Sequence, residues 1–240
     1  MFTFAIEGWR AWAAGIHDEL EWREWAQAPF CPSMAEDSVP PLAFLPAMQR
    51  RRLNMMARMV FDCAWPLAQG RSAMPLVYAS RYGETARDFE LLLALARGEP
   101  LSPTSFGLSV HNAVAGQWSI IRHEMTESVA ISAEGDGLEH AFLEAGMLLA
   151  QGRDEVLVVA VEERPPLAYC PWVDDVPFSH ALAVRLKAGT ACSLSLAPGG
   201  EAAAAPLLPG ALQWLRHLLS GASSWRHQAA GREWTWALNP

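Results

Sequence analysis

A short acidic turn between an apolar strand and a helix is the part of this sequence best placed to do chemistry. The turn reads SAEGD over residues 132–136 and joins the predicted strand 128–133 to the predicted helix 137–150. The start of a helix stabilises negative charge, because its free N–H groups and its dipole point there. A carboxylate such as Glu134 gains that stabilisation, but it cannot carry an acyl group as a thioester. Glu134 is therefore a candidate for a carboxylate that occupies a reactive position without acting as a nucleophile.

A second interpretation of the turn is structural. Glu134 and Asp136 would then stabilise helix 137–150 as acidic groups at its first turn, a contribution of about 0.3–1 kcal/mol. The two interpretations are compatible, and the sequence leaves both open.

Polar residues also lie at the turn before the predicted helix 112–122. His111 and Asn112 could line a pocket or a subunit interface, or Asn112 could simply cap the helix. Ser109 and His111 share one face of a strand, but the sequence contains no GxSxG motif, which argues against a serine hydrolase. The acidic segment 162–166 after strand 155–162 is interpreted only as the exit from that strand.

The composition excludes several classes of protein. The net charge of −8 argues against nonspecific nucleic-acid binding, which needs a basic surface. The four cysteines show no CxxC or Cys/His spacing, so neither a metal site nor a cofactor is expected. The cysteines are instead expected to be reduced thiols of a cytoplasmic protein. The N-terminus does not resemble a signal peptide, and no window approaches 18 uninterrupted apolar residues, so neither secretion nor a membrane span is expected.

Apolar periodicity and turn residues predict the elements that position these side chains. Strands are predicted at 2–8, 75–81, 105–110, 128–133, 155–162, 178–187 and 191–197, the last two joined by a turn at Gly189. Helices are predicted at 46–63, 84–97, 112–122, 137–150 and 209–220. A proline-rich connector covers 29–46, a low-complexity linker covers 200–209, residues 9–30 have no clear assignment, and residues 231–240 are a strand or a docked tail.

The alternation of strands and helices over 75–162 is typical of right-handed crossovers in a parallel sheet. The strand pair that follows suggests an antiparallel edge. The sequence therefore predicts an α/β fold over residues 1–240 as a single domain. Its sheet would be mixed but mostly parallel, of a five-stranded type, with helices on both faces.

Three motifs within residues 102–163 resemble the N-terminal half of a β-ketoacyl synthase of the thiolase fold. SVHNAVAG at 109–116 resembles the turn and small-residue helix of that family, ISAE at 131–134 resembles its nucleophile strand, and GRDEVLVVAVEE at 152–163 resembles the next helix end and strand. Glu134 stands on the position of the family's nucleophilic cysteine, and Gly135 does so if the register shifts by one residue. Neither supplies a thiol.

The resemblance implies a partner rather than a catalyst. A full synthase has two similar halves, and its second half supplies two histidines that this chain does not extend far enough to contain. The chain is thus similar to the half-length, chain-length-factor-like subunits of aryl-polyene pigment pathways, which pair with a full-length ketosynthase as a heterodimer. The implied function is a non-catalytic subunit that shapes acyl chain length in polyketide or fatty-acid-type biosynthesis.

The resemblance also assigns surfaces. The two-fold axis of thiolase-fold dimers would pass near helix 112–122 and strand 128–133. Candidate tunnel and interface residues are Asn112, Trp118, Ile120, Ile121 and Met125. An acyl carrier protein, which is acidic, could dock on the basic residues Arg50, Arg51 and Arg52, near Arg58, although a solvated helix face would also account for them.

In a half-length chain, part of the apolar sheet surface must be covered either by other side chains of the same chain or by a partner protein. The sequence has eleven tryptophans, and large rings favour cores and interfaces. The candidates for this cover are Trp118, Trp172, Trp214, Trp225, Trp234 and Trp236.

Two other hypotheses stay open. The chain could be a stand-alone thioesterase or malonyl-thioester decarboxylase that uses Glu134, or it could be a homodimeric scaffold without an acyl ligand.

Overall fold

A seven-stranded mixed sheet forms the centre of the computed structural model, which describes residues 1–33, 38–200 and 208–239. The strands are β1 Phe2–Ala13, β2 Leu76–Ala79, β3 Ser128–Ile131, β4 Glu155–Glu162, β5 His180–Pro198, β6 Ser224–Ala229 and β7 Arg232–Leu238. Their order is β3-β2-β4-β5-β7-β6, and β1 also pairs with β5. β2 runs parallel to β3 and β4, whereas every pairing of β5 and the β6–β7 pairing are antiparallel.

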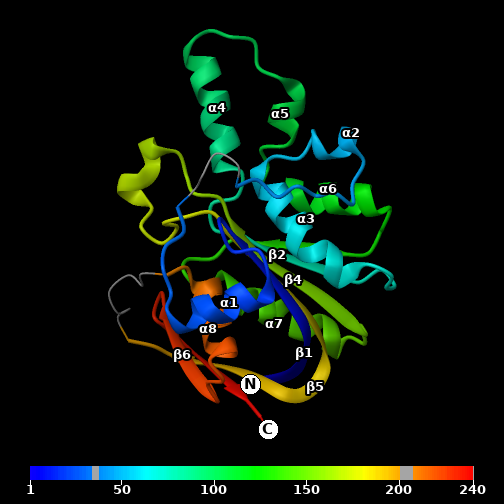
Figure 1. Ribbon diagram of the computed structural model, residues 1–240, viewed down its shortest axis with the longest axis vertical. Coiled ribbons are helices and arrows are strands. Elements are labelled where there is room, and N and C mark those ends of the chain that lie inside the picture. The colour runs from blue at the N-terminus through cyan, green and yellow to red at the C-terminus, as the bar shows by residue number, and fades with distance from the viewer. Residues whose placement is uncertain (34–37, 201–207, 240) are drawn as a thin grey trace.

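Helices cover both faces of this sheet (Figure 1). They are α1 Glu19–Gln27, α2 Ala47–Arg50, α3 Met55–Ala68, α4 Thr85–Ala96, α5 Pro103–Gly107, α6 Ala113–Arg122, α7 Gly137–Ala150 and α8 Gly210–Leu219, with a 3-10 turn η1 Leu167–Trp172. α3 and α6 pack on one face, and α1, α7 and α8 pack on the other. Strand β4 shows why, since Val156, Val158 and Ala160 face the α7 side while the alternate residues face α3.

The predicted fold class is confirmed, but the sheet has more strands and more antiparallel pairings than the prediction gave it. Only the β3-β2-β4 portion is parallel, and the described strands number seven rather than five. The predicted helices 112–122 and 137–150 and the strands 128–133 and 155–162 are present within two residues at each end. Their signal was strong because each carries an uninterrupted apolar pattern of one period.

Two strand predictions were wrong for identifiable reasons. Residues 103–107 form helix α5, because Pro103 starts the helix and the Ser102 side chain accepts a hydrogen bond from the Ser105 N–H at 3.2 Å. The predicted turn at Gly189 lies within the single strand β5 of 19 residues. A Cβ atom on Gly189 would lie 2.8 Å from the Cβ of Ala5, so this glycine permits close approach of β1 rather than a reversal.

Other boundaries also differ from the predictions. β1 extends to Ala13 and is followed by α1, in the region that had no assignment. The predicted helix 46–63 divides into α2 and α3. The C-terminal tail forms the hairpin β6–β7. Within the predicted connector 29–46, residues 34–37 lie outside the described residues, as do residues 201–207 of the predicted linker 200–209.

Four of the six candidate tryptophans pack in the same core as α7, within this chain. Trp214, Trp225, Trp234 and Trp236 are buried in the core that contains α7, and they come from α8 and the C-terminal hairpin. Trp118 is buried in the other core, whereas Trp172 is 77% exposed. Helix α8 and the C-terminal hairpin therefore cover apolar surface on the α7 side of the sheet, because each tryptophan ring buries a large apolar area.

Helix α4 was predicted correctly in position, but its leucines are not core residues. No residue of α4 is buried, and Leu92, Leu93 and Leu95 are exposed. α4 and α5 project together from the end of the molecule opposite the two chain termini (Figure 1). An apolar projection of this kind is typical of a surface that another protein covers.

Candidate functional site

A cavity of about 490 Å³ opens where β2, β3 and β4 end. Its walls come from the ends of these strands, the bend after β3, the segment after η1, the start of α8 and the β6–β7 hairpin. Ligands of open α/β sheets bind in this position, outside the carboxyl ends of parallel strands. The cavity is therefore the candidate site, and it contains the acidic turn singled out in the sequence.

Glu134 lies on the bend between β3 and α7 and lines this cavity. Its side chain is largely exposed, and one carboxylate oxygen lies 3.8 Å from the Arg81 guanidinium at the end of β2. Gly135 follows with a φ of +81°, a left-handed conformation that favours glycine. Ser132 donates a hydrogen bond to the Arg81 carbonyl at 3.0 Å, which ties the bend to the neighbouring strand end.

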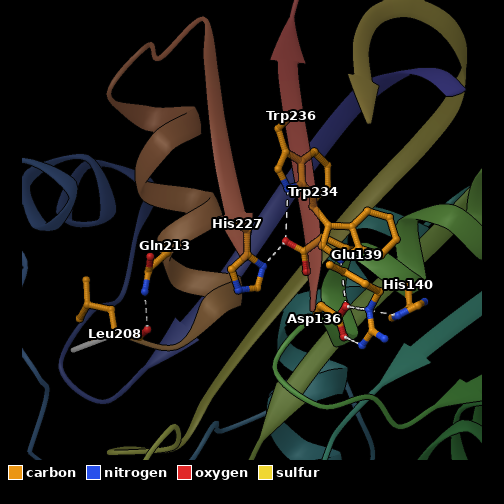
Figure 2. A network of polar contacts seen from close by, with 9 residues as sticks. Asp136, Glu139, His140, Leu208, Gln213, His227, Trp234 and Trp236 are labelled. Carbon is orange, nitrogen blue, oxygen red and sulfur yellow. Dashed lines mark hydrogen bonds and ion pairs between the residues drawn. The ribbon is translucent and has the colours of Figure 1, made fainter. Parts of the chain in front are cut away.

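Asp136 lies at the start of helix α7, as the structural interpretation expected, but its carboxylate binds groups outside the helix. Asp136 occupies the N-cap position, but its side chain makes no capping hydrogen bond. The carboxylate is fully buried and accepts hydrogen bonds from Arg232 Nε at 2.7 Å and Trp234 Nε1 at 2.9 Å. His140 Nε2 lies 3.4 Å away (Figure 2). Asp136 thus joins the start of α7 to the C-terminal hairpin.

A second buried carboxylate lies one turn further along α7. Glu139 accepts hydrogen bonds from His227 Nδ1 at 2.8 Å and from Trp236 Nε1 at 3.3 Å (Figure 2). Burial lowers the pKa of His227, but the hydrogen bond and charge of Glu139 outweigh burial and raise it above its usual range. Both α7 carboxylates therefore hold the hairpin in place. Local sequence pattern cannot pair residues that lie so far apart in the chain.

Glu162, the last residue of β4, lines another part of the cavity wall. Its carboxylate accepts hydrogen bonds from Ser80 Oγ at 3.0 Å, from the Arg81 N–H and from the Tyr82 N–H at 3.4 Å. Burial raises the pKa of Glu162 to about 7 in spite of these hydrogen bonds. The interpretation of segment 162–166 as no more than a strand exit is wrong here, because Glu162 fixes the turn that carries Arg81. An acid directly after the buried apolar run 156–161 was the signal for it.

Arg81 is held by the segment after η1. Asp175 accepts a hydrogen bond from Arg81 Nη1 at 2.8 Å and another from the Tyr82 hydroxyl at 2.7 Å. The Arg81 guanidinium also lies over the Tyr82 ring, 5.1 Å from its centre. The site is therefore rigid on the Arg81 side and open at Glu134.

Replacing Glu162 by glutamine is expected to flatten the pH dependence of stability. Because burial raises the pKa of Glu162 from 4.5 to about 7, the folded state holds a proton that the unfolded state has lost in this window. The free energy of unfolding therefore falls as the pH rises from 4.5 to about 7. Burial also raises the pKa of Glu163 to about 7, so the variant should keep part of the slope. Urea denaturation at a series of pH values measures it, and an unchanged slope would contradict the assignment.

The predicted tunnel and interface residues fall into two groups. Asn112 is exposed, Ile120 is 72% exposed and Met125 is 96% exposed, so these three are accessible to a partner. Trp118 is buried against Phe61, with ring centres 5.2 Å apart, and is a core residue rather than an interface residue. Ile121 is half-buried against the same core. Asn112 is at the N-cap of α6 but its side chain makes no capping hydrogen bond.

The predicted carrier-protein docking residues also fall into two groups, one bound within the chain and one exposed. Arg50 donates a hydrogen bond to the Pro41 carbonyl, and Arg58 donates to the carbonyls of Pro40, Arg50 and Leu53. These two hold the proline-rich connector in place. Arg51 and Arg52 are exposed after α2 and remain available to a partner.

The described lining of the cavity contains no cysteine. Cys63 and Cys192 are buried in the two cores, and burial raises the pKa of both thiols. No cluster of three or more metal-binding side chains occurs in residues 1–33, 38–200 and 208–239. No helix in this part of the chain is long and apolar enough to cross a membrane.

Comparisons with known proteins agree on the family. The family model described as beta-ketoacyl synthase, N-terminal domain, matches residues 22–237. A chain from the structure of the ketosynthase ApeO in complex with its chain length factor ApeC, from Xenorhabdus doucetiae, is 30% identical. The match covers 99% of this chain and 100% of that chain, with a TM-score of 0.88.

Two more distant structures share the fold. A chain of the ishigamide ketosynthase/chain length factor is 11% identical, with 98% and 99% of the two chains covered and a TM-score of 0.71. A β-ketoacyl synthase from Burkholderia phymatum STM815 is 14% identical, with 86% of this chain and 67% of that chain covered and a TM-score of 0.61. A search of curated proteins returned no match. The matched span and the 30% identical relative place this chain in the family of the β-ketoacyl synthase N-terminal domain.

Proposed function

We propose that this chain is a non-catalytic ketosynthase-like subunit that pairs with a full-length ketosynthase and shapes the length of the acyl product. The observation that carries the proposal is Glu134, a carboxylate on the bend where the family's thiol is expected. The chain also matches, over nearly its whole length, a chain from a complex of a ketosynthase with its chain length factor. We assign the subunit to an aryl-polyene type pathway in the cytoplasm, which is consistent with its reduced, scattered cysteines.

The chemistry of the cavity supports a non-catalytic role. Condensation requires a thiolate nucleophile and hydrogen-bond donors that point at the developing oxyanion. The described lining presents carboxylates instead, from Glu134, Glu162 and Asp175, and no thiol. Carboxylates would destabilise an oxyanion by charge repulsion. A stand-alone thioesterase or decarboxylase would meet the same obstacle, since both reactions develop negative charge on an oxygen.

The proposed contact with the ketosynthase includes the edge of the sheet at β3. Among the described strands, β3 pairs with β2 alone, so its other side is free to pair. Ile120 lies on the last turn of α6 and is 72% exposed, and Met125 lies on the connection from α6 to β3 and is 96% exposed. A polar environment is unfavourable for both side chains, and a partner at this edge would remove them from water.

An acyl carrier protein is the second proposed partner. Carrier proteins are acidic and dock through complementary charge. Arg51 and Arg52 are exposed and fit that role, whereas Arg50 is bound to the connector.

Co-purification with the full-length ketosynthase of the same pathway tests the proposal. We expect a stable one-to-one complex by native mass spectrometry, with condensing activity in the complex and none in this chain alone. Turnover of acyl- or malonyl-thioesters by the isolated chain, lost in Glu134→Gln, would instead show a stand-alone enzyme. A homodimer that does not bind the ketosynthase would show that the chain is a scaffold rather than a ketosynthase partner.

Product length should respond to the size of residue 120 in the complex. Ile120→Trp is expected to shorten the acyl products, because the exposed side chain would project further into the shared interface. Ile120→Ala is expected to lengthen them. Mass spectrometry of the released products measures the change. Ile121 is less suited to this experiment, because it packs against the core and its replacement would disturb folding instead.

The matched control is Leu20→Trp, a change of similar size at an exposed position on α1, on the opposite face of the sheet. Products from this variant should be unchanged. Unchanged products from folded Ile120→Trp and Ile120→Ala complexes would remove residue 120 from the tunnel.

A further inference from the structure

Glu162 and His180 face each other across two neighbouring strands at the cavity. They are directly opposite in the antiparallel register of β4 and β5. Directly opposed residues point to the same side of a sheet, with Cβ atoms about 4.5–5.5 Å apart. Both side chains line the cavity. The two groups therefore form one pair on the cavity wall, separate from Glu134 on the bend.

The imidazole of His180 presents a hydrogen-bond acceptor to the cavity. Nδ1 lies 3.1 Å from the Phe178 carbonyl oxygen, which can only accept, so Nδ1 carries the proton. Burial lowers the pKa of His180 to about 4, so the ring is neutral near pH 7 and its Nε2 is a lone-pair acceptor. His180 is 3% exposed, and no hydrogen bond to Nε2 occurs within the described part of the chain. Nε2 is not among the fully enclosed polar atoms without a partner, so it is open to the cavity that His180 lines and can accept a hydrogen bond from a ligand there.

The charges around this pair favour a cation. The cavity is also lined by Glu134, Asp174 and Asp175. Among the described lining residues Arg81 is the one guanidinium, and it is shared between Asp175 at 2.8 Å and Glu134 at 3.8 Å. Glu139 is balanced by His227. The carboxylates of Glu134, Glu162, Asp174 and Asp175 outnumber this one guanidinium, so the cavity favours a ligand that donates hydrogen bonds and carries positive charge.

We propose that this cavity binds a small protonated amine whose ammonium group lies between Glu162 and His180. An ammonium has three donors and no acceptor, which matches an imidazole lone pair, a carboxylate and further carboxylates nearby. The proposal does not depend on the heterodimer, because every residue involved belongs to this chain.

Binding should be coupled to proton release. The pKa of Glu162 is raised to about 7 by burial, and the groups that face it are Ser80, Arg81 and Tyr82 at the end of β2, Asp175 after η1 and His180 on β5. An ammonium beside the carboxylate favours its charged form and displaces the proton. Affinity should therefore rise with pH between about 6 and 8.

Isothermal titration calorimetry of the full chain with 1,4-diaminobutane tests the proposal, with neutral 1,4-butanediol as the matched control ligand. We expect the diamine to bind with proton release, seen as a dependence of the heat on the ionisation enthalpy of the buffer, and the diol not to bind. Glu162→Gln should weaken binding about tenfold or more and remove its pH dependence. His180→Leu should weaken binding without removing the pH dependence.

The control variant is Glu127→Gln, whose carboxylate is paired with Arg153 away from the cavity. It should bind the diamine like the wild-type chain. Absence of diamine binding would overturn the proposal, as would equal binding of the diol or wild-type affinity in folded Glu162→Gln and His180→Leu. If Glu162→Gln does not fold, His180→Leu alone decides, because it leaves the carboxylate and its three backbone and side-chain donors in place.

Discussion

Replacing Asp136 by alanine is expected to lower the free energy of unfolding by about 3 kcal/mol at neutral pH. The carboxylate is fully buried and accepts hydrogen bonds from Arg232 and from the buried Trp234 indole. Hydrogen bonds to a charged group contribute about 1.5–3 kcal/mol each, and a buried donor left unsatisfied costs about 1–3 kcal/mol. Urea denaturation followed by tryptophan fluorescence measures the change.

The loss should disappear in acid. Burial raises the pKa of Asp136, but hydrogen bonds from Arg232 and Trp234 outweigh burial and hold the pKa below its ordinary value of 3.8. A carboxyl group with a lowered folded-state pKa contributes stability above its unfolded value, and this stability is lost as the pH falls through the folded value. The difference between the wild-type chain and Asp136→Ala should therefore be constant above about pH 5 and shrink below pH 3.8.

Arg226→Gln is the matched control on the same hairpin. Arg226 forms an ion pair with Glu233 at 3.4 Å on an exposed surface, and such pairs contribute about 0.2–1 kcal/mol at most. A loss in Asp136→Ala no larger than in this control would mean that the hairpin is held by its apolar contacts alone.

The part of the fold that the sequence predicted well is the region in which local pattern and tertiary role coincide. Strand β4 reads EVLVVAVE, and its interior residues are buried on alternate faces against the two cores. Helix α7 was predicted at its observed limits, because apolar residues continue through it without a proline. The place of residue 134 followed from strand β3, helix α7 and the bend between them.

The rest of the site depends on contacts that have no local signal. Asp136 meets Arg232 across 96 residues of sequence and Glu139 meets His227 across 88, between the start of a helix and a hairpin that was expected only as a strand or tail. Buried polar pairs of this kind are specified by tertiary geometry rather than by periodicity. The same holds for β5, where Gly189 permits close approach of β1, a contact that depends on a strand at the other end of the chain.

Trp118 shows how a correct element can lead to a wrong role. The helix α6 was predicted correctly, and a family-based interface near it included Trp118, Ile120 and Ile121. On a helix, positions two apart point in different directions, so 118 and 120 cannot both face the same partner. Trp118 packs into the core, where the Arg122 guanidinium lies 5.0 Å from its ring centre, and Ile120 faces outward.

Replacing Ile120 by aspartate is expected to weaken the proposed complex with the full-length ketosynthase about 100-fold. A central apolar residue of an interface contributes about 2–4 kcal/mol, and each 1.4 kcal/mol corresponds to a factor of ten in Kd. Here the exposed isoleucine would give way to a charge that must lose its hydration on binding. Because residue 120 faces solvent, the isolated chain should keep its stability. Binding of labelled wild-type and variant chains to an immobilised ketosynthase measures Kd.

Leu20→Asp supplies the control, because Leu20 is as exposed as Ile120 but lies on α1, on the opposite face of the sheet. This variant should bind the ketosynthase with wild-type affinity. If Leu20→Asp weakened binding and Ile120→Asp did not, the partner would contact the α1 face instead. The free edge of β3 would then need another explanation. A selective loss in Ile120→Asp, together with unchanged unfolding of the isolated chain, would place the ketosynthase against α6 and β3, next to the bend that carries Glu134.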